Sequence, residues 1–147
     1  MSITSSTTGR VDRETGRTHS AHSARKNRAL WAAQVLLAAV IAFAAIPKLA
    51  GAHSAVAMFG QIGAGQWLRY LVGTAELAGA VGLLIPRLAG LAAAGLAADM
   101  AGASIINIAV LHSAAVALTI PLCAALALLA RARWEHATKF LAVRTGR

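Results

Sequence analysis

The chain is poor in charged residues, and its middle is almost free of them. Of its 147 residues, 13% are Asp, Glu, Lys or Arg, while 58% are hydrophobic. Soluble domains average about 25% charged residues, so this composition excludes an ordinary soluble domain. Residues 29–130 keep three basic residues, Lys48, Arg69 and Arg87, and the other eleven of the fourteen lie at the two ends of the chain. This distribution indicates an integral membrane protein that resides in a lipid bilayer.

Thiols, metal ligands and phosphate-binding loops are equally scarce. The single cysteine, Cys123, excludes an intrachain disulfide and a Cys-x-x-Cys redox pair. His53 and His112 are isolated from each other and the other three histidines lie in the tails, so no predicted span carries histidines at the spacing of a metal site, and no metal is expected. No glycine-rich segment opens a Lys-Ser/Thr turn. Membrane topology explains the basic ends more simply than nucleic acid does, so no nucleic acid partner is expected.

Four apolar segments have about the length of a membrane-crossing helix. About 20 apolar residues are needed to cross the hydrocarbon core. None of the segments alternates with the period of a strand, so all four are predicted to be helices. The predicted fold class is therefore all-α, a transmembrane four-helix bundle. The segments cover residues 30–46, 67–85, 88–110 and 113–130.

The predicted domain organisation has three parts. Residues 1–28 are rich in Ser, Thr and Arg and poor in apolar residues, and are predicted to form a disordered basic tail. Residues 29–131 form the bundle, and residues 132–147 form a second basic tail. Because both tails are basic and the connection between the third and fourth segments has no Lys or Arg, the positive-inside rule predicts cytoplasmic termini. The expected location is a plasma membrane of the bacterial inner-membrane type.

A short amphipathic helix is predicted between the first two segments. Ala55, Met58 and Phe59 recur at i, i+3 and i+4, which places them on one face of a helix. We expect this helix to pack on the bundle.

Three polar residues lie deep within the predicted spans. They are Glu76, Asp99 and Asn107. An acidic residue at the centre of a span costs about 2.5–3.5 kcal/mol on insertion scales, so such groups are expected to face the bundle interior and to pair or bind. Lys48, at the end of the first span, is predicted to pair with Glu76 or to bracket one small polar ligand with it. Together these four residues form the candidate intramembrane polar site, to which the sequence assigns no catalytic role.

Asp99 has two predicted surroundings. It is expected to face Glu76 across the bundle interior, or to form a hydrogen bond with Gln34 or Thr119 of a neighbouring span. In either case its carboxylate points away from lipid.

Glycines flank both acidic residues at helical spacing. Gly73 and Gly79 lie three residues before and after Glu76, and Gly95 and Gly102 lie four before and three after Asp99. Glycine allows two helices to approach closely in a membrane. All four are therefore predicted to be helix-packing positions.

Four stretches in the middle of the chain form a recognisable pattern. They are Pro47-Lys48-Leu49-Ala50-Gly51, residues 65–73 from Gly65-Gln66-Trp67 to Val72-Gly73, residues 76–87 from Glu76-Leu77-Ala78-Gly79 to Ile85-Pro86-Arg87, and Leu96 with Met100-Ala101-Gly102-Ala103. By this pattern the chain resembles the DoxX-like family of small four-helix membrane proteins, over roughly residues 30–130. The family pattern usually has a His where Asn107 stands and an apolar residue where Asp99 stands.

The resemblance implies a function that the residues alone do not. Some members of the family look like subunits of a thiosulfate:quinone oxidoreductase, and others like membrane partners of superoxide dismutase and a sulfurtransferase. This implies a membrane subunit of a redox or oxidative-stress assembly, associated with quinone. Oxidoreductase activity rests on the resemblance only, and no binding motif for flavin, haem or nicotinamide is evident.

An alternative function remains from a different class. The chain would then be a non-enzymatic membrane scaffold or a small-ligand-binding protein, in which the buried acidic residues only specify packing. The partner also stays open between a soluble or membrane-bound oxidoreductase and a second copy of the chain.

Overall fold

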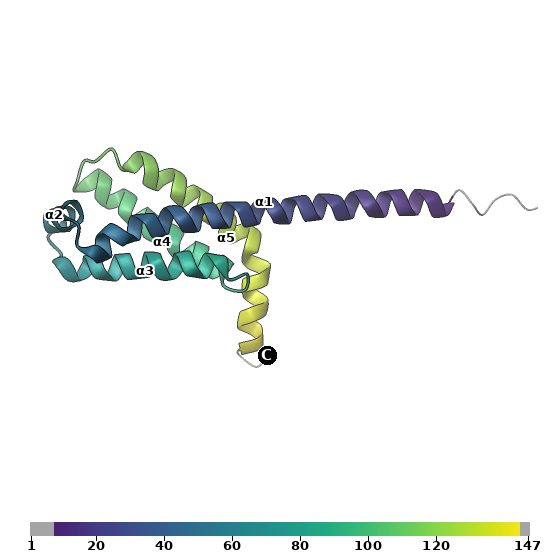
Figure 1. Cartoon of the computed structure of the whole chain (residues 1–147). Coiled ribbons are helices and arrows are strands. Elements are labelled where there is room, and N and C mark those ends of the chain that lie inside the picture. The colour runs from purple at the N-terminus through teal and green to yellow at the C-terminus, as the bar shows by residue number, and fades with distance from the viewer. Residues whose placement is uncertain (1–7, 145–147) are drawn as a thin grey trace, which may run out of the picture. The chain divides into compact units, whose positions relative to one another are not determined.

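The computed structural model describes the backbone of residues 8–144 and the side chains of Arg25 and residues 27–134. This part of the chain is all-helical, without a strand (Figure 1). It divides into two compact units, one up to Ala33 and one from Gln34 onward. The helices are α1 (Thr8–Ala50), α2 (His53–Ile62), α3 (Gln66–Leu84), α4 (Ala89–Ala109) and α5 (Val116–Arg144).

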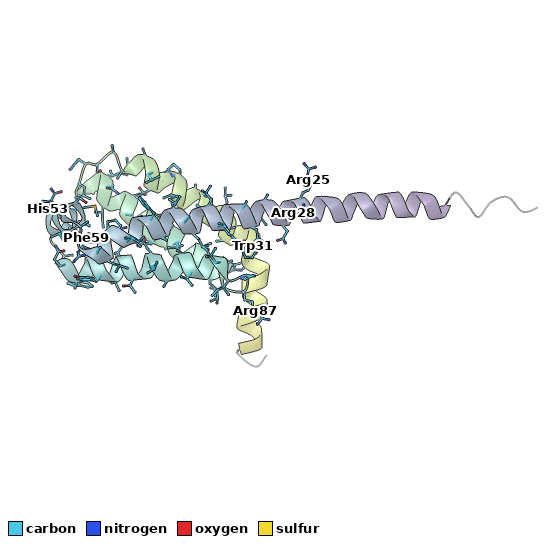
Figure 2. The ribbon with its side chains drawn as sticks, in the orientation of Figure 1. Arg25, Arg28, Trp31, His53, Phe59 and Arg87 are labelled. Atoms are coloured by element: carbon cyan, nitrogen blue, oxygen red, sulfur yellow. The ribbon has the colours of Figure 1, made fainter. Side chains whose placement is uncertain are left out.

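The first unit is helical from Thr8, whereas the sequence predicts a disordered tail over residues 1–28. The physical reason lies in the composition. No proline precedes Pro47, and Arg, Glu and Ala favour a helix, so α1 can extend from its apolar part towards the N-terminus. Arg25 and Arg28 project outward from this helix (Figure 2). Residues 1–7 lie outside the described residues.

Three helical segments of the described chain are long and apolar enough to cross a membrane: Asn27–Ala50, Ala89–Ala109 and Val116–Trp134. The sequence predicts a fourth span over residues 67–85, and the structure forms a helix there, but α3 is not among the three. Arg69 and Glu76 lower its mean hydropathy. Both side chains are buried, so they are turned away from the outer surface of α3.

The helices expose many large apolar side chains. Examples are Leu36 and Phe43 of α1, Ile105 of α4 and Leu128 of α5, each more than half exposed. Large exposed apolar surfaces are rare on monomeric soluble proteins and are expected where lipid covers a helix. The structure therefore supports a lipid bilayer as the environment of the bundle.

A buried polar bridge joins three helices of the second unit. Gln34 of α1, fully buried, donates a hydrogen bond from Nε2 to the Leu83 carbonyl of α3 at 2.7 Å. Its Oε1 accepts one from Arg133 Nε of α5 at 3.0 Å. Arg133 is buried, although the sequence places it in a basic tail that starts at residue 132. α5 continues through residue 132 to Arg144.

Close packing around α3 depends on glycine. A Cβ on Gly79 would lie 2.6 Å from Leu96 Cδ2 of α4, and a Cβ on Gly73 would lie 3.0 Å from Leu49 of α1. A Cβ on Gly82 would lie 2.9 Å from Ala92, a contact that the sequence analysis missed. The predicted packing roles of Gly73 and Gly79 agree with this geometry.

Gly95 and Gly102 of α4 do not have the predicted packing role. Apart from the adjacent residues and the nearby backbone of α4 itself, no atom of the described residues lies within 4 Å of a Cβ built on either of them. The helical spacing placed them beside Asp99, but spacing alone does not say whether a neighbouring helix approaches that side of α4. Both positions have room for a side chain.

The connection between α1 and α3 carries the predicted short helix. Ala55 and Phe59 of α2 are buried, and α2 packs against α3. His53 at its start is exposed (Figure 2). The sequence-based prediction of a loop helix packed on the bundle is confirmed.

Replacing Gly79 by alanine tests the close approach of α3 and α4. Because the new Cβ would clash with Leu96, we expect the variant to lose about 1–3 kcal/mol of unfolding free energy, as overpacked cores do. Gly95→Ala is the matched control, since it brings the same gain in helix propensity, about 1 kcal/mol, without a clash. Denaturant unfolding in detergent micelles measures both variants. Equal stability of the two would contradict the assigned contact.

Candidate functional site

A cavity of about 460 Å³ lies within the second unit and is bordered by all five helices. Pockets for small ligands usually measure about 300–1,000 Å³ and are mostly apolar with a few polar groups. This cavity follows that pattern. Its apolar wall includes Ile41, Met58, Phe59, Ile106 and Leu122, and its charged and polar wall consists of Lys48, Glu76, Asp99, Asn107 and Thr119.

The four residues of the predicted intramembrane polar site thus line one cavity. They come from the end of α1, the middle of α3, and the middle and second half of α4.

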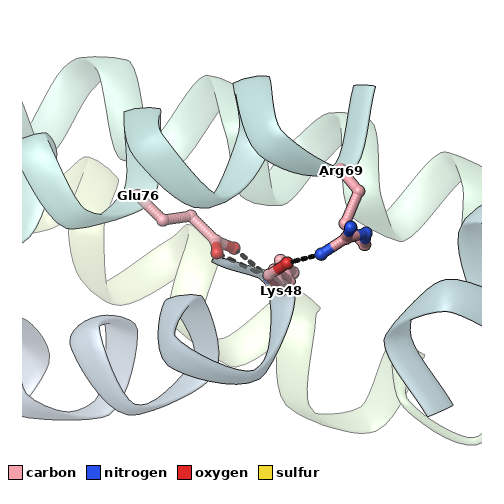
Figure 3. A network of polar contacts seen from close by, with 3 residues as sticks. All are labelled: Lys48, Arg69 and Glu76. Atoms are coloured by element: carbon pink, nitrogen blue, oxygen red, sulfur yellow. Dashed lines mark hydrogen bonds and ion pairs between the residues drawn. The ribbon is translucent and has the colours of Figure 1, made fainter. Parts of the chain in front are cut away.

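Lys48 and Glu76 form an ion pair in the cavity wall (Figure 3). Lys48 Nζ lies 2.6 Å from Glu76 Oε1 and 2.5 Å from Oε2, so both carboxylate oxygens are engaged. The side chains are 13% and 2% exposed, respectively. Hydrogen bonds between charged groups gain strength when water is excluded from them. The predicted contact between the two side chains is confirmed.

The end of α1 positions Lys48. Gly51 adopts a left-handed conformation with φ of 71°, and the Ala52 N–H donates to the Pro47 carbonyl at 3.0 Å. This six-residue closure is the usual way in which a helix ends at glycine. The closure fixes the last turn of α1, and with it the direction in which the Lys48 side chain leaves the helix.

Arg69 of α3 holds the same turn from the other side (Figure 3). Its Nη1 donates to the Lys48 carbonyl, and its Nε donates to Gln66 Oε1 at 2.9 Å. A cation at the C-terminal end of a helix is stabilised by the helix dipole. The guanidinium also lies 4.1 Å from the centroid of the Tyr70 ring. The sequence gave no sign of this capping role, because the helix that Arg69 caps is distant in the chain.

Asp99 faces the cavity, as the sequence predicts for its side of the helix. The two predicted hydrogen bonds are wrong. Gln34 bonds to Leu83 and Arg133, and Thr119 accepts a hydrogen bond from Ser104 at 2.8 Å. Asp99 Oδ2 is buried, and no hydrogen-bond partner reaches it among the described residues.

Asn107 and Ser104 satisfy themselves within the bundle. Asn107 Nδ2 donates to the Ala103 carbonyl at 2.9 Å, one turn earlier on α4. Ser104 Oγ lies 2.7 Å from the Met100 carbonyl and links α4 to Thr119 of α5. Ser104 was missed by the sequence analysis, since a serine in a small-residue helix is a common packing residue. Asn107 also lines the cavity.

The arrangement suits binding and proton exchange more than covalent chemistry. The wall carries one ammonium group and two carboxyl groups. The single thiol, that of Cys123, does not line the cavity and donates a hydrogen bond to the Ala97 carbonyl at 3.3 Å. Among the described residues, no group of His, Cys, Asp and Glu side chains is placed to hold a metal ion. A small apolar molecule with a polar head fits such a wall.

A double-mutant cycle tests the ion pair. We expect Lys48→Met to destabilise the bundle by about 3–5 kcal/mol, because it leaves a buried carboxylate without its partner. Glu76→Gln should also destabilise it, and the double variant should recover part of the combined loss. Unfolding in detergent micelles gives the coupling energy. Strictly additive effects would contradict an energetic role for the pair.

The comparisons with known proteins agree with this picture. The profile of the DoxX-like family matches residues 32–130. That range contains every residue that lines the cavity. No curated protein and no solved structure matches the chain. Since the match covers about two thirds of the sequence, the protein belongs to the DoxX-like family.

Proposed function

We propose that the protein is a membrane subunit of a redox or oxidative-stress assembly and that its cavity binds a quinone. One observation carries the proposal: charged groups of α1, α3 and α4 line the same cavity, whose wall is mostly apolar. A quinone has the matching shape, a ring with polar oxygens attached to an apolar tail. When bound, it supplies the transfer of electrons together with protons.

In this proposal, apolar side chains surround the quinone ring and Lys48 donates a hydrogen bond to it. The apolar side chains of Ile41, Met58 and Phe59 exclude water from the ring. Lys48 has three N–H donors and directs at least one contact to each Glu76 oxygen, so a further donor is left for a ring oxygen. Electrons come from a partner protein, because a single cysteine forms no dithiol pair in this chain.

The proposed topology has four crossing helices, with α3 as the additional one. α3 has 19 residues, and its exposed large side chains are apolar apart from the ring ends of Trp67 and Tyr70. Such rings are enriched at membrane interfaces. The basic ends of the chain and Arg87, between α3 and α4, then lie on one side of the membrane, which the positive-inside rule assigns to the cytoplasm. A bacterial plasma membrane fits this arrangement.

A second candidate function is that of a non-enzymatic scaffold or small-ligand binder. The completed ion pair between Lys48 and Glu76 favours it, because the pair is satisfied within the chain. What occupies the cavity distinguishes the candidates, since a scaffold needs no occupant and a small-ligand binder would hold a molecule other than quinone.

Extraction of bound lipids tests quinone binding. We expect the full chain, purified in mild detergent, to carry quinone at near-stoichiometric amounts, detected by chromatography and mass spectrometry. Ala103→Phe should abolish this, because Ala103 lines the cavity and the larger ring would fill it. Ala124→Phe is the matched control on an exposed position of α5 outside the cavity. Absence of quinone from the unaltered protein, or equal amounts in both variants, would favour the scaffold.

Reporter fusions test the topology. A green fluorescent reporter fused after Arg147 should fluoresce, because it folds in the cytoplasm, and alkaline phosphatase fused after His112 should be active on the outer side. The reverse pattern would overturn the proposed orientation. An active phosphatase after Arg87 would show that α3 does not cross the membrane.

A further inference from the structure

We infer that Asp99 bonds the polar head of the ligand beside the remaining N–H donor of Lys48, and that Glu76, which is held by Lys48, positions the cavity wall. The inference rests on the proposed quinone site and assigns its contacts. It follows from how the two carboxyl groups of the cavity are satisfied, from the space beside them, and from the charge they face.

Glu76 is fully engaged by the protein. Both of its oxygens contact Lys48 Nζ, and Arg69 fixes the turn that carries Lys48. A ligand that took Glu76 as its anchor would have to break this pair, which would leave a charge buried without its partner. Glu76 therefore acts as a structural part of the wall.

Asp99 is not engaged in this way. Its Oδ2 is buried and, within the described residues, has no hydrogen-bond partner. Leaving a buried polar group unsatisfied is unfavourable, and native structures rarely do so without a reason. By contrast, the buried polar side chains of Gln34, Ser104 and Asn107 each form hydrogen bonds with the protein. A ligand atom that forms a hydrogen bond with Asp99 Oδ2 would give this oxygen the partner that it lacks.

The helix surface around Asp99 leaves room for that atom. Ala98, Gly102 and Ala103 line the cavity next to it, and all three have small side chains or none. A Cβ on Gly102 would meet no described atom within 4 Å beyond the adjacent residues and the nearby backbone of α4. The glycine that the sequence assigned to helix packing therefore borders open space at the carboxyl group.

The charges of the wall select the chemistry of the ligand. When Asp99 is ionised, two carboxylates face one ammonium group, so an anionic head would meet net repulsion. A neutral ring that carries hydroxyl or carbonyl oxygens meets none, and it can share a hydrogen with Asp99 whether the ring or the carboxyl group supplies the proton. A quinone and its quinol satisfy this condition, whereas an oxyanion such as thiosulfate does not.

The test compares ligand binding with stability in the same variants. The probes are decylubiquinone and its quinol, added to the full chain in detergent and followed by quenching of tryptophan fluorescence. We expect Asp99→Leu to raise the Kd of both probes about tenfold or more, equivalent to about 1.4 kcal/mol. Asp99→Asn keeps the size and one acceptor oxygen, so it should raise the Kd less.

The same Asp99→Leu variant should melt higher than the unaltered protein without ligand, by at least about 2 °C, because a buried group without a partner is removed. Gln34→Leu is the matched control. It also replaces a buried polar side chain by leucine, but it removes the donor to the Leu83 carbonyl and should melt lower. If Asp99 served only the fold, replacing it by leucine would lower the melting temperature, as replacing Gln34 does.

Three results would overturn the inference, and they are distinguishable. If Asp99→Leu binds the probes as tightly as the unaltered chain, Asp99 does not contact the ligand, while the proposed quinone site stands. If Asp99→Leu melts lower, Asp99 belongs to the fold. If the unaltered chain binds neither probe, the proposed function itself fails, and the inference fails with it.

Discussion

The ion pair between Lys48 and Glu76 is the contact on which the arrangement of the second unit depends. It joins the end of α1 to the middle of α3, and it satisfies a carboxylate that would otherwise stand in an apolar helix. Arg69 adds a second link between the same helices through the Lys48 carbonyl. With both charged side chains of α3 turned inward, the outer face of the helix is left to apolar side chains.

Tight and open packing lie on different parts of the helices. α3 meets α1 at Gly73 and meets α4 at Gly79 and Gly82, where no side chain larger than hydrogen would fit without a shift. On α4, Gly102 borders the cavity instead. The bundle is therefore held firmly along α3 and is hollow beside Asp99. A binding site requires both properties, because rigid walls position the groups that contact a ligand.

The sequence was sufficient to predict the helical class, the loop helix and the meeting of Lys48 with Glu76, because each follows from local periodicity or from the cost of a charge in lipid. It was not sufficient for Arg69, whose partner is a backbone carbonyl of a distant helix. Nor could it separate Gly79 from Gly102, because both lie at helical spacing from an acidic residue and only the neighbouring helix decides their role. The extent of α1 and α5 was underestimated, since polar helix-forming residues extend a helix that an apolar segment has begun.

The inward position of Arg69 and Glu76 has a consequence for how the chain is made. In the proposed topology, α3 is the crossing helix with the weakest hydropathy, and its charges are compensated by α1. α1 is synthesised first, so the partner is already present when α3 reaches the bilayer. Insertion of α3 then draws on contacts with α1 as well as on its own apolar side chains.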